Sequence, residues 1–168
     1  MERCRCPAPT ATFYPVVSCK GASRPTITQA SPCSEVFMLD HYRDARYHDG
    51  GRGECVGGVR RFDCYGLVRA VRAEQFGLAT LPCYAGVATT DARRVSRSLV
   101  EVRDGLQPCE AQAGAMALCY TGALALHCAV LVAVGGRLGA LECTVDQHVR
   151  WQPLRQFCRD FSRVEFYT

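Results

Sequence analysis

The sequence predicts an α+β domain in which one helix packs on an antiparallel sheet. Three observations lead to this fold class: helix-like segments come first, short apolar or β-branched runs fill the last third, and glycine pairs separate those runs. The chain has 168 residues, 48% of them hydrophobic, which suits a single core. We therefore expect one compact domain over residues 35–168, preceded by an arm over residues 1–34.

The arm, residues 1–34, is interrupted by prolines and has no sustained helical or strand periodicity. Its four thiols, on Cys4, Cys6, Cys19 and Cys33, are enough in number for a zinc or iron-sulfur site. Their spacing lacks the paired Cys-x-x-Cys hairpins of common zinc sites, so we expect no metal there. With few large apolar residues, the arm is expected to gain order by docking on another protein.

Charge and hydropathy exclude two classes of partner. The net charge of +4 comes mostly from arginines that are spread along the chain without a long run of like charges, so a dedicated nucleic-acid arm is not expected. No apolar run reaches the roughly 18 residues of a membrane span, and the first residues do not resemble a secretory signal. We therefore expect a soluble protein, not exported by the ordinary route, and most of its 12 cysteines should be core residues, as at Cys119, Cys128 and Cys143.

The first half of the domain predicts two helices around a loop. A short helix is expected over residues 34–46, and residues 49–58, half of them glycine, are expected to form a loop. The segment 62–77 predicts a helix with Asp63 as its N-cap and Gly77 at its end. Its apolar residues should face the core, and its charged residues, Arg69, Arg72 and Glu74, should face solvent.

The second half predicts a helix followed by a strand meander. After a connection over residues 78–90, a helix is expected over residues 91–103, with Asp91 as a candidate cap. The Gly135-Gly136 pair predicts a tight hairpin turn between two of the strands that follow. The expected strands lie at residues 114–119, 126–134, 137–144 and 163–168.

Cys64 is the thiol for which a chemical role can be argued. A cysteine attacks as thiolate, and its ordinary pKa of about 8.5 leaves little thiolate at neutral pH. Cys64 follows the capping Asp63 at the first turn of a predicted helix, where free N–H groups and the helix dipole favour a negative charge. A base is also required, and position alone does not choose among the four histidines, His41, His48, His127 and His148.

The residues around Cys64 resemble the NlpC/P60 cell-wall peptidases. Residues 62–68, Phe-Asp-Cys-Tyr-Gly-Leu-Val, are similar to the nucleophile motif of that family, with the aromatic residue typical of its phage-tail branch. Residues 47–51 resemble its Tyr-x-x-Gly-Gly stretch, and residues 127–130 resemble its histidine strand. The resemblance covers about residues 36–168 and implies a reduced papain-like α+β fold, with the cysteine at a helix N-terminus facing a histidine on the sheet.

This resemblance also implies roles for individual residues. Cys64 would be the nucleophile and His127 the base, while Tyr47 and Asp63 would support the reacting carbonyl. No metal or cofactor is implied.

Two positions depart from the family pattern. Ala115 stands where the family usually has aspartate, and a count along the strand after the histidine puts Gly139 where a polar residue usually orients the imidazole. Another group must then take that role, with Glu142, Gln147 and His148 as candidates, or activity is reduced.

The function implied by the resemblance is that of a phage or phage-like tail-tip endopeptidase, which cleaves stem-peptide amide bonds of peptidoglycan to aid cell-wall penetration. Such a protein is made in the host cytoplasm, is carried at the virion tail tip and contacts other tail-tip proteins, here through the arm. The main alternative is a structural tail-tip or assembly subunit with weak or no catalysis, which Gly139 and Ala115 favour. A metal-binding assembly factor that uses the arm cysteines is a third hypothesis.

Overall fold

The computed structural model describes residues 40–84 and 90–168. The predicted arm, its four cysteines and the start of the helix expected at residues 34–46 lie outside this part of the chain. Within it, that helix is a single turn at residues 40–43, and strand β1 (Arg46–Tyr47) follows at once. The predicted helix therefore extended too far toward its C-terminal end.

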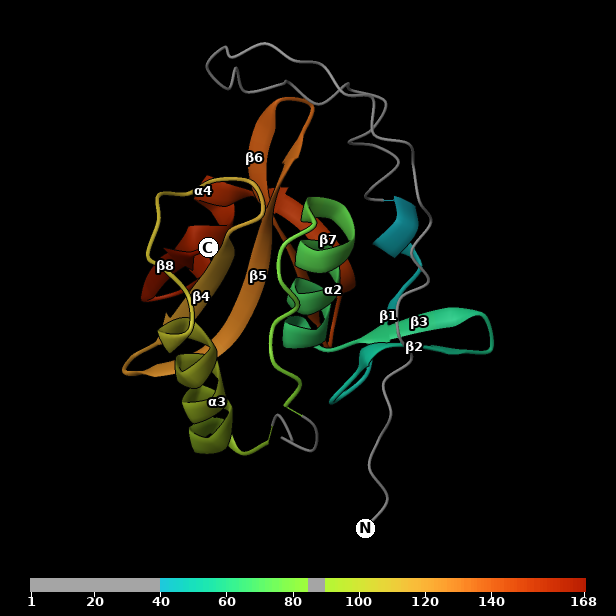
Figure 1. Ribbon diagram of the computed structural model, residues 1–168, viewed down its shortest axis with the longest axis horizontal. Helices are drawn as coiled ribbons and strands as arrows, with labels where there is room; N and C mark the ends of the chain where they lie inside the picture. The colour runs from blue at the N-terminus through green and yellow to red at the C-terminus, as the bar shows by residue number, and fades with distance from the viewer. Residues whose placement is uncertain (1–39, 85–89) are drawn as a thin grey trace, which may run out of the picture.

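A five-stranded antiparallel sheet in the order β7-β6-β5-β4-β8 forms the centre of the domain (Figure 1). The mixed α+β class with helices and an antiparallel sheet is thereby confirmed. All four strands expected from the sequence are present, whereas β7 was not predicted. The five strands are β4 (Met116–Thr121), β5 (Leu124–Val134), β6 (Arg137–Thr144), β7 (His148–Pro153) and β8 (Arg163–Tyr167).

The turn between β5 and β6 is the predicted glycine hairpin. Gly135 and Gly136 have φ values of 57° and 73°, which a residue with a side chain adopts only with strain. From this turn the two strands pair residue by residue, and the last pair of the ladder is Val130 with Leu141. Beyond that pair β5 and β6 are no longer bonded to each other, which opens the sheet next to His127.

The glycine-rich stretch at residues 49–58 is not the loop that was predicted. It contains β2 (Arg52–Val56), which pairs with β3 (Val59–Phe62) as a second hairpin, and β1 completes a small three-stranded sheet. Gly57 and Gly58 make its turn, with φ values of 60° and 80°. This hairpin packs against the start of the following helix, because Asp63 N–H donates to Gly51 O at 3.1 Å.

Both long helices have the predicted caps. Helix α2 (Cys64–Phe76) begins after Asp63 and ends at Gly77, whose φ of 60° is left-handed, and helix α3 (Ala92–Asp104) begins after Asp91. One residue of α2 was assigned to the wrong face: Arg72 is buried, and its guanidinium donates to Gly114 O at 2.6 Å. The arginine thus ties the helix to the loop before β4 instead of facing solvent. None of the described helices combines the length and the apolar character that crossing a membrane requires.

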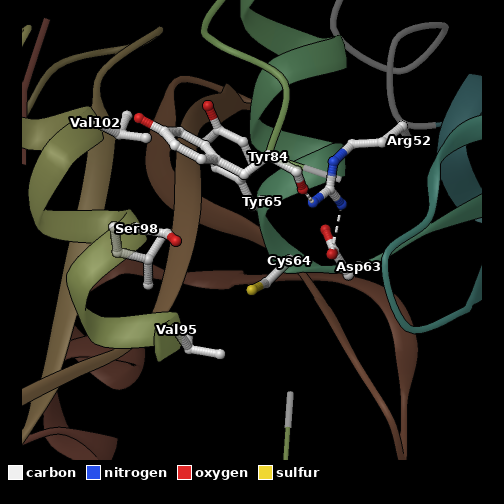
Figure 2. A pocket seen from close by; sticks show the side chains of 9 residues that line it. Arg52, Asp63, Cys64, Tyr65, Tyr84, Val95, Ser98 and Val102 are labelled. Carbon is white, nitrogen blue, oxygen red and sulfur yellow. Dashed lines mark hydrogen bonds and ion pairs between the residues drawn. The ribbon is translucent and has the colours of Figure 1, made fainter. Parts of the chain in front are cut away.

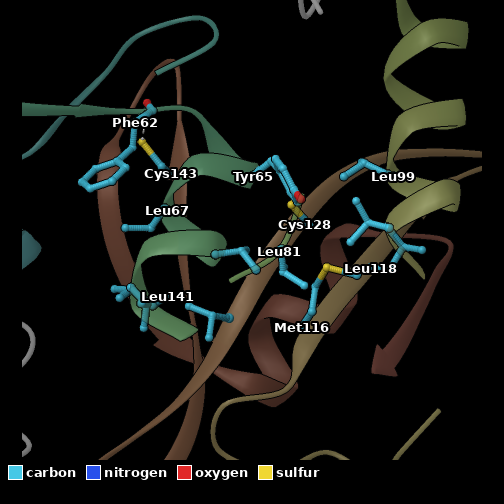
Figure 3. Packing of buried hydrophobic residues seen from close by; sticks show 14 of the residues in the cluster. Phe62, Tyr65, Leu67, Leu81, Leu99, Met116, Leu118, Cys128, Leu141 and Cys143 are labelled. Carbon is cyan, nitrogen blue, oxygen red and sulfur yellow. Dashed lines mark hydrogen bonds between the residues drawn. The ribbon is translucent and has the colours of Figure 1, made fainter. Parts of the chain in front are cut away.

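The core has two layers, one on each face of the five-stranded sheet. The larger cluster lies between the sheet and helices α2 and α3, and it includes Cys128 and Cys143 (Figure 3). The smaller cluster lies on the other face, where Phe157 of the short helix α4 (Leu154–Phe157) and Cys119 are buried. A 3₁₀ turn (Cys158–Asp160) continues α4. All three cysteines expected in the core are therefore buried, as small apolar residues.

Candidate active site

The first turn of α2 is fixed by Asp63. Its Oδ1 accepts a hydrogen bond from Gly66 N–H at 2.6 Å, which caps the helix, and its Oδ2 pairs with Arg52 Nη1 from β2. The same guanidinium donates to Gly51 O at 2.9 Å and to Tyr84 O at 2.7 Å. Both oxygens of Asp63 are thus engaged within the protein. The carboxylate positions the helix that carries Cys64, and its role toward a reacting carbonyl stays a prediction.

Two glycines allow the β2–β3 hairpin to approach this turn closely. A Cβ added at Gly66 would lie 2.0 Å from Gly51 O, and one added at Gly51 would lie 2.9 Å from the backbone of Arg61. Side chains at either position would push the hairpin away from the helix. Gly66 in the nucleophile motif and Gly51 in the upstream stretch are therefore both needed for the backbone of the site to pack this closely.

Cys64 and His127 lie close enough at the junction of α2 and β5 for each side chain to shift the pKa of the other. Strand alternation turns His127 and Cys128 to opposite faces of the sheet. Because the β5–β6 ladder ends at Val130 and Leu141, the edge of β5 is open beside both residues. At this edge Cys64 also meets the thiol and the backbone N–H of Cys128. The structure thus brings the predicted nucleophile and the predicted base together.

Glu142 contacts the far side of the imidazole. Its Oε2 lies 2.7 Å from His127 Nε2, and its Oε1 accepts from Arg150 Nε at 2.7 Å and from Gln152 Nε2 at 2.9 Å. The ring also stacks on Phe161, with centroids 5.7 Å apart. With Nε2 engaged by Glu142, the other ring nitrogen is left for Cys64. Of the three candidates for the imidazole orienter, Glu142 is the one that contacts His127.

These contacts shift the ionisation of both reacting groups. Hydrogen bonding by the Cys128 thiol, together with hydrogen bonding and positive charge from His127, holds the pKa of Cys64 well below its usual range, although burial opposes the shift. Burial lowers the pKa of His127, but hydrogen bonds and charges from Cys64 and Glu142 outweigh it and raise that pKa to about 9. Both shifts favour a thiolate beside an imidazolium, the reactive form of a cysteine nucleophile.

The other two orienter candidates have different contacts. Gln147 Oε1 accepts from Arg150 Nη1 at 2.6 Å, so it lies behind the arginine that binds Glu142. His148 Nδ1 accepts from the backbone N–H of Tyr47 at 3.2 Å, which ties β7 to β1. Tyr47 pairs with Phe62 in the small sheet and packs against the larger core cluster. It lies close to the start of α2, and its role toward a substrate stays a prediction.

Gly139 does not occupy the position of an orienter. It pairs with Val132 on β6, and a Cβ there would lie 2.3 Å from the indole ring of Trp151, whose Nε1 donates to Val132 O at 3.1 Å. Glycine is thus required to seat the tryptophan, because a side chain at position 139 would collide with the indole ring. Ala115, the other departure from the family pattern, is buried in the smaller core cluster.

A small cavity of about 40 Å³ opens beside Cys64 (Figure 2). Figure 2 shows the Cys64 sulfur directed toward the space between α2 and α3. Arg52 and Asp63 form one side of this cavity, and most of the remaining lining is apolar. Its other lining residues are Tyr65, Tyr84, Val95, Ser98, Leu99 and Val102.

Sequence reasoning missed four residues that contact the site: Arg52, Cys128, Arg150 and Gln152. A signal for two of them was present, because Val149 and Trp151 alternate with Arg150 and Gln152 in the period of a strand.

Among the described residues, no group of three or more His, Cys, Asp or Glu side chains is arranged to hold a metal ion. No protein-family model matches the chain, and no curated protein matches its sequence. An activity must therefore be inferred from the arrangement of Cys64, His127 and Glu142 and from the motifs around them.

Proposed function

We propose that this chain is a cysteine hydrolase of the NlpC/P60 type, with a reduced papain-like fold. The observation that carries the proposal is the chain of contacts from Cys64 through His127 to Glu142. Nucleophile, base and a group that orients the base are the three parts that nucleophilic catalysis requires. The family resemblance of residues 62–68 and 127–130 supports the same assignment independently of the geometry.

The reaction follows from the ionisation of the site. The Cys64 thiolate attacks an amide carbonyl, and a C–S bond forms as the carbonyl oxygen becomes negative. The His127 imidazolium then donates its proton to the leaving amine as the C–N bond breaks. Neutral His127 next accepts a proton from water, whose oxygen attacks the thioester, and Cys64 leaves as thiolate again.

The start of α2 supplies groups for the developing oxyanion. A helix leaves its first N–H groups without intrahelical partners. In α2, Asp63 Oδ1 accepts from Gly66 N–H and the Asp63 carbonyl accepts from Leu67 N–H. The N–H groups of Cys64 and Tyr65 remain at the helix end next to the thiolate, where they and the helix dipole favour negative charge.

Peptidoglycan is the proposed substrate. The mainly apolar cavity beside Cys64 has room for only a small group next to the scissile bond. By the resemblance to the phage-tail branch, we place the protein at the virion tail tip, where it aids cell-wall penetration. The arm over residues 1–34 would join it to a hub or adaptor protein.

The alternative of an inactive structural subunit rested mainly on the missing orienter. Glu142, at 2.7 Å from His127, supplies such a group, so the catalytic proposal is the better supported one.

Digestion of purified peptidoglycan tests the proposal. Wild-type protein should release stem-peptide fragments detectable by mass spectrometry, Cys64→Ala should release none, and the exposed Cys55→Ala should match wild type. Brief, limiting iodoacetamide should label Cys64 first among the thiols. A folded wild-type protein that releases no fragment from several peptidoglycan chemotypes would count against the proposal, as would equal release by Cys64→Ala.

A further inference from the structure

The carboxylate of Glu142 is held by a second strand that sequence analysis did not find. Arg150 lies directly opposite Glu142 in the β6–β7 pairing, and Gln152 is two residues further along the same face of β7. Both donate to Oε1, which leaves Oε2 for His127. We propose that Arg150 is a positioning residue, which keeps Glu142 ionised and aimed at His127. This inference rests on the hydrolase function proposed above.

The buried charge of Glu142 needs a permanent counter-charge. Glu142 is only 2% exposed, and a buried carboxylate without a cation carries a large desolvation cost. In the proposed reaction His127 is positively charged only until it protonates the leaving amine. Arg150 stays charged at every stage, because the guanidinium does not titrate in this range. It is therefore the cation that keeps Glu142 ionised when His127 is neutral.

The pKa of Glu142 is consistent with stabilisation by both His127 and Arg150. Burial raises the pKa of Glu142, but contacts with His127 and then Arg150 outweigh it and lower the pKa below its usual value. Around the reacting pair the charges alternate in sign, from Cys64 thiolate to His127 imidazolium, Glu142 carboxylate and Arg150 guanidinium.

The clamp on Glu142 also fixes the direction of its carboxylate. A carboxylate turns easily about its last side-chain bond, a broad and nearly two-fold torsion. Two donors on Oε1 fix that rotation, and Arg150 is itself held by Gln147 Oε1 at 2.6 Å. With Oε2 fixed at 2.7 Å from Nε2, the imidazole keeps its other nitrogen turned to Cys64. Loss of Arg150 therefore removes both the charge and half of the clamp on Oε1.

Nuclear magnetic resonance titration of the His127 imidazole tests the proposal without any substrate. A nearby cation by itself disfavours an imidazolium, so removing Arg150 would raise the pKa of His127 if the arginine acted only through its charge on the ring. If Arg150 acts through Glu142, then Arg150→Leu should make His127 titrate at lower pH than in wild type. An unchanged or higher midpoint overturns the inference.

A double-mutant cycle on Cys64 alkylation adds a second readout. Arg150→Leu should slow the reaction with iodoacetamide at neutral pH on the order of tenfold in the wild-type background. In a Glu142→Gln background the same change should alter the rate by less than about twofold. Equal slowing in both backgrounds, or none in wild type, would show that Arg150 does not act through Glu142.

Controls separate this inference from folding and from the proposed function. Arg150 is 32% exposed, so its substitution should leave the melting temperature close to that of the exposed Arg155→Leu. Arg150→Lys keeps the charge without the planar donor and should recover part of the alkylation rate. Wild-type protein that fails to digest peptidoglycan, while the titration and the cycle come out as expected, would refute the substrate proposal and leave the positioning role intact.

Discussion

Two arginine–carboxylate pairs stand behind the reacting residues, Arg52 with Asp63 on the Cys64 side and Arg150 with Glu142 on the His127 side. They differ in what the second carboxylate oxygen touches. In Asp63 that oxygen accepts a helix N–H, so the pair holds backbone in place. In Glu142 it faces an ionisable ring, so the pair sets a charge. The same side-chain chemistry therefore serves structure on one side of the site and reactivity on the other.

The two arginine–carboxylate pairs also differ in how deeply the arginine is buried. The side chain of Arg52 is 11% exposed and that of Asp63 is 7% exposed, so neither can be rehydrated if its partner is removed. Arg150 is 32% exposed and can turn toward solvent. We therefore expect loss of the first pair to affect folding most, and loss of the second to affect ionisation most.

The largest effect on stability is expected from Asp63→Asn. The amide oxygen keeps the cap to Gly66 N–H, but Arg52 loses its counter-charge in a buried position. Breaking a buried ion pair from one side costs about 3–5 kcal/mol, and the two carbonyls on Arg52 argue for the lower end. Denaturant unfolding should show this loss, whereas Asp104→Asn, in an exposed pair, should cost less than about 1 kcal/mol. Equal effects of the two substitutions would contradict the buried-pair argument.

Next in size is Gly66→Ala, which tests the backbone on the Cys64 side. The added Cβ would lie 2.0 Å from Gly51 O, and neither backbone segment can move without disturbing the hairpin or the helix. Overpacking of this kind costs about 1–3 kcal/mol, and a contact between backbones argues for the upper end. Gly105→Ala is the matched control, because its φ is −87° and the nearest atom is 3.5 Å away. A melting temperature of Gly66→Ala equal to that of the control would rule out the close packing.

How far the sequence predicted the fold depended on whether the deciding signal was local. The caps of α2 and α3 depend on single residues next to each helix, and both were found. Two Gly-Gly pairs form hairpin turns with nearly the same φ values, yet the one at residues 57–58 was interpreted as loop because other glycines surround it. Glycine density thus hid a strand that a turn-based interpretation would have found.

In the site, local motifs located Cys64 and His127, while the groups that hold them come from distant parts of the chain. Arg52 and Arg150 gain their roles from strand pairing, which no motif encodes. The count along the strand put the orienter at Gly139, but the side chain that contacts His127 is that of Glu142. Glycine at position 139 is explained by Trp151, a contact that depends on the unpredicted β7.

A smaller stability effect, with a clear effect on pH dependence, is expected from Glu142→Gln. Arg150 can reach solvent and the amide oxygen still accepts, so unfolding free energy at neutral pH should fall by about 1–2 kcal/mol, less than for Asp63→Asn. Because the folded pKa of Glu142 is lowered, its stabilisation exists above the unfolded pKa and disappears as pH falls through the folded one. The stability difference from wild type should therefore shrink in acid.

At high pH the same variant tests His127. Its raised pKa of about 9 means that the imidazolium contributes stability and reactivity below that pH and loses both as pH rises through it. The alkaline limb of peptidoglycan hydrolysis should lie near pH 9 in wild type and at lower pH in Glu142→Gln. An alkaline limb that does not move would mean that Glu142 has no part in the ionisation of His127.

The smallest expected effect, from Cys128→Ala, asks whether the Cys64 side is purely structural. Interaction with the Cys128 thiol is the main cause that lowers the pKa of Cys64, while the pKa of Cys128 is raised, so Cys128 stays a thiol that can donate. Removing the Cys128 thiol should raise the pKa of Cys64 toward its usual value.

Because an S–H group is a weak donor, alkylation of Cys64 in Cys128→Ala should slow only several-fold near pH 6, which corresponds to about 1 kcal/mol. In alkaline solution the rate should equal that of wild type, because the thiolate is complete in both proteins. Cys109→Ala, which removes a partly buried thiol packed against the smaller core cluster, should leave the alkylation rate unchanged at both pH values. A rate that falls equally at low and high pH would indicate that Cys128 holds the position of Cys64 and not its charge. The Cys64 side would then serve structure alone, and the His127 side alone would set ionisation.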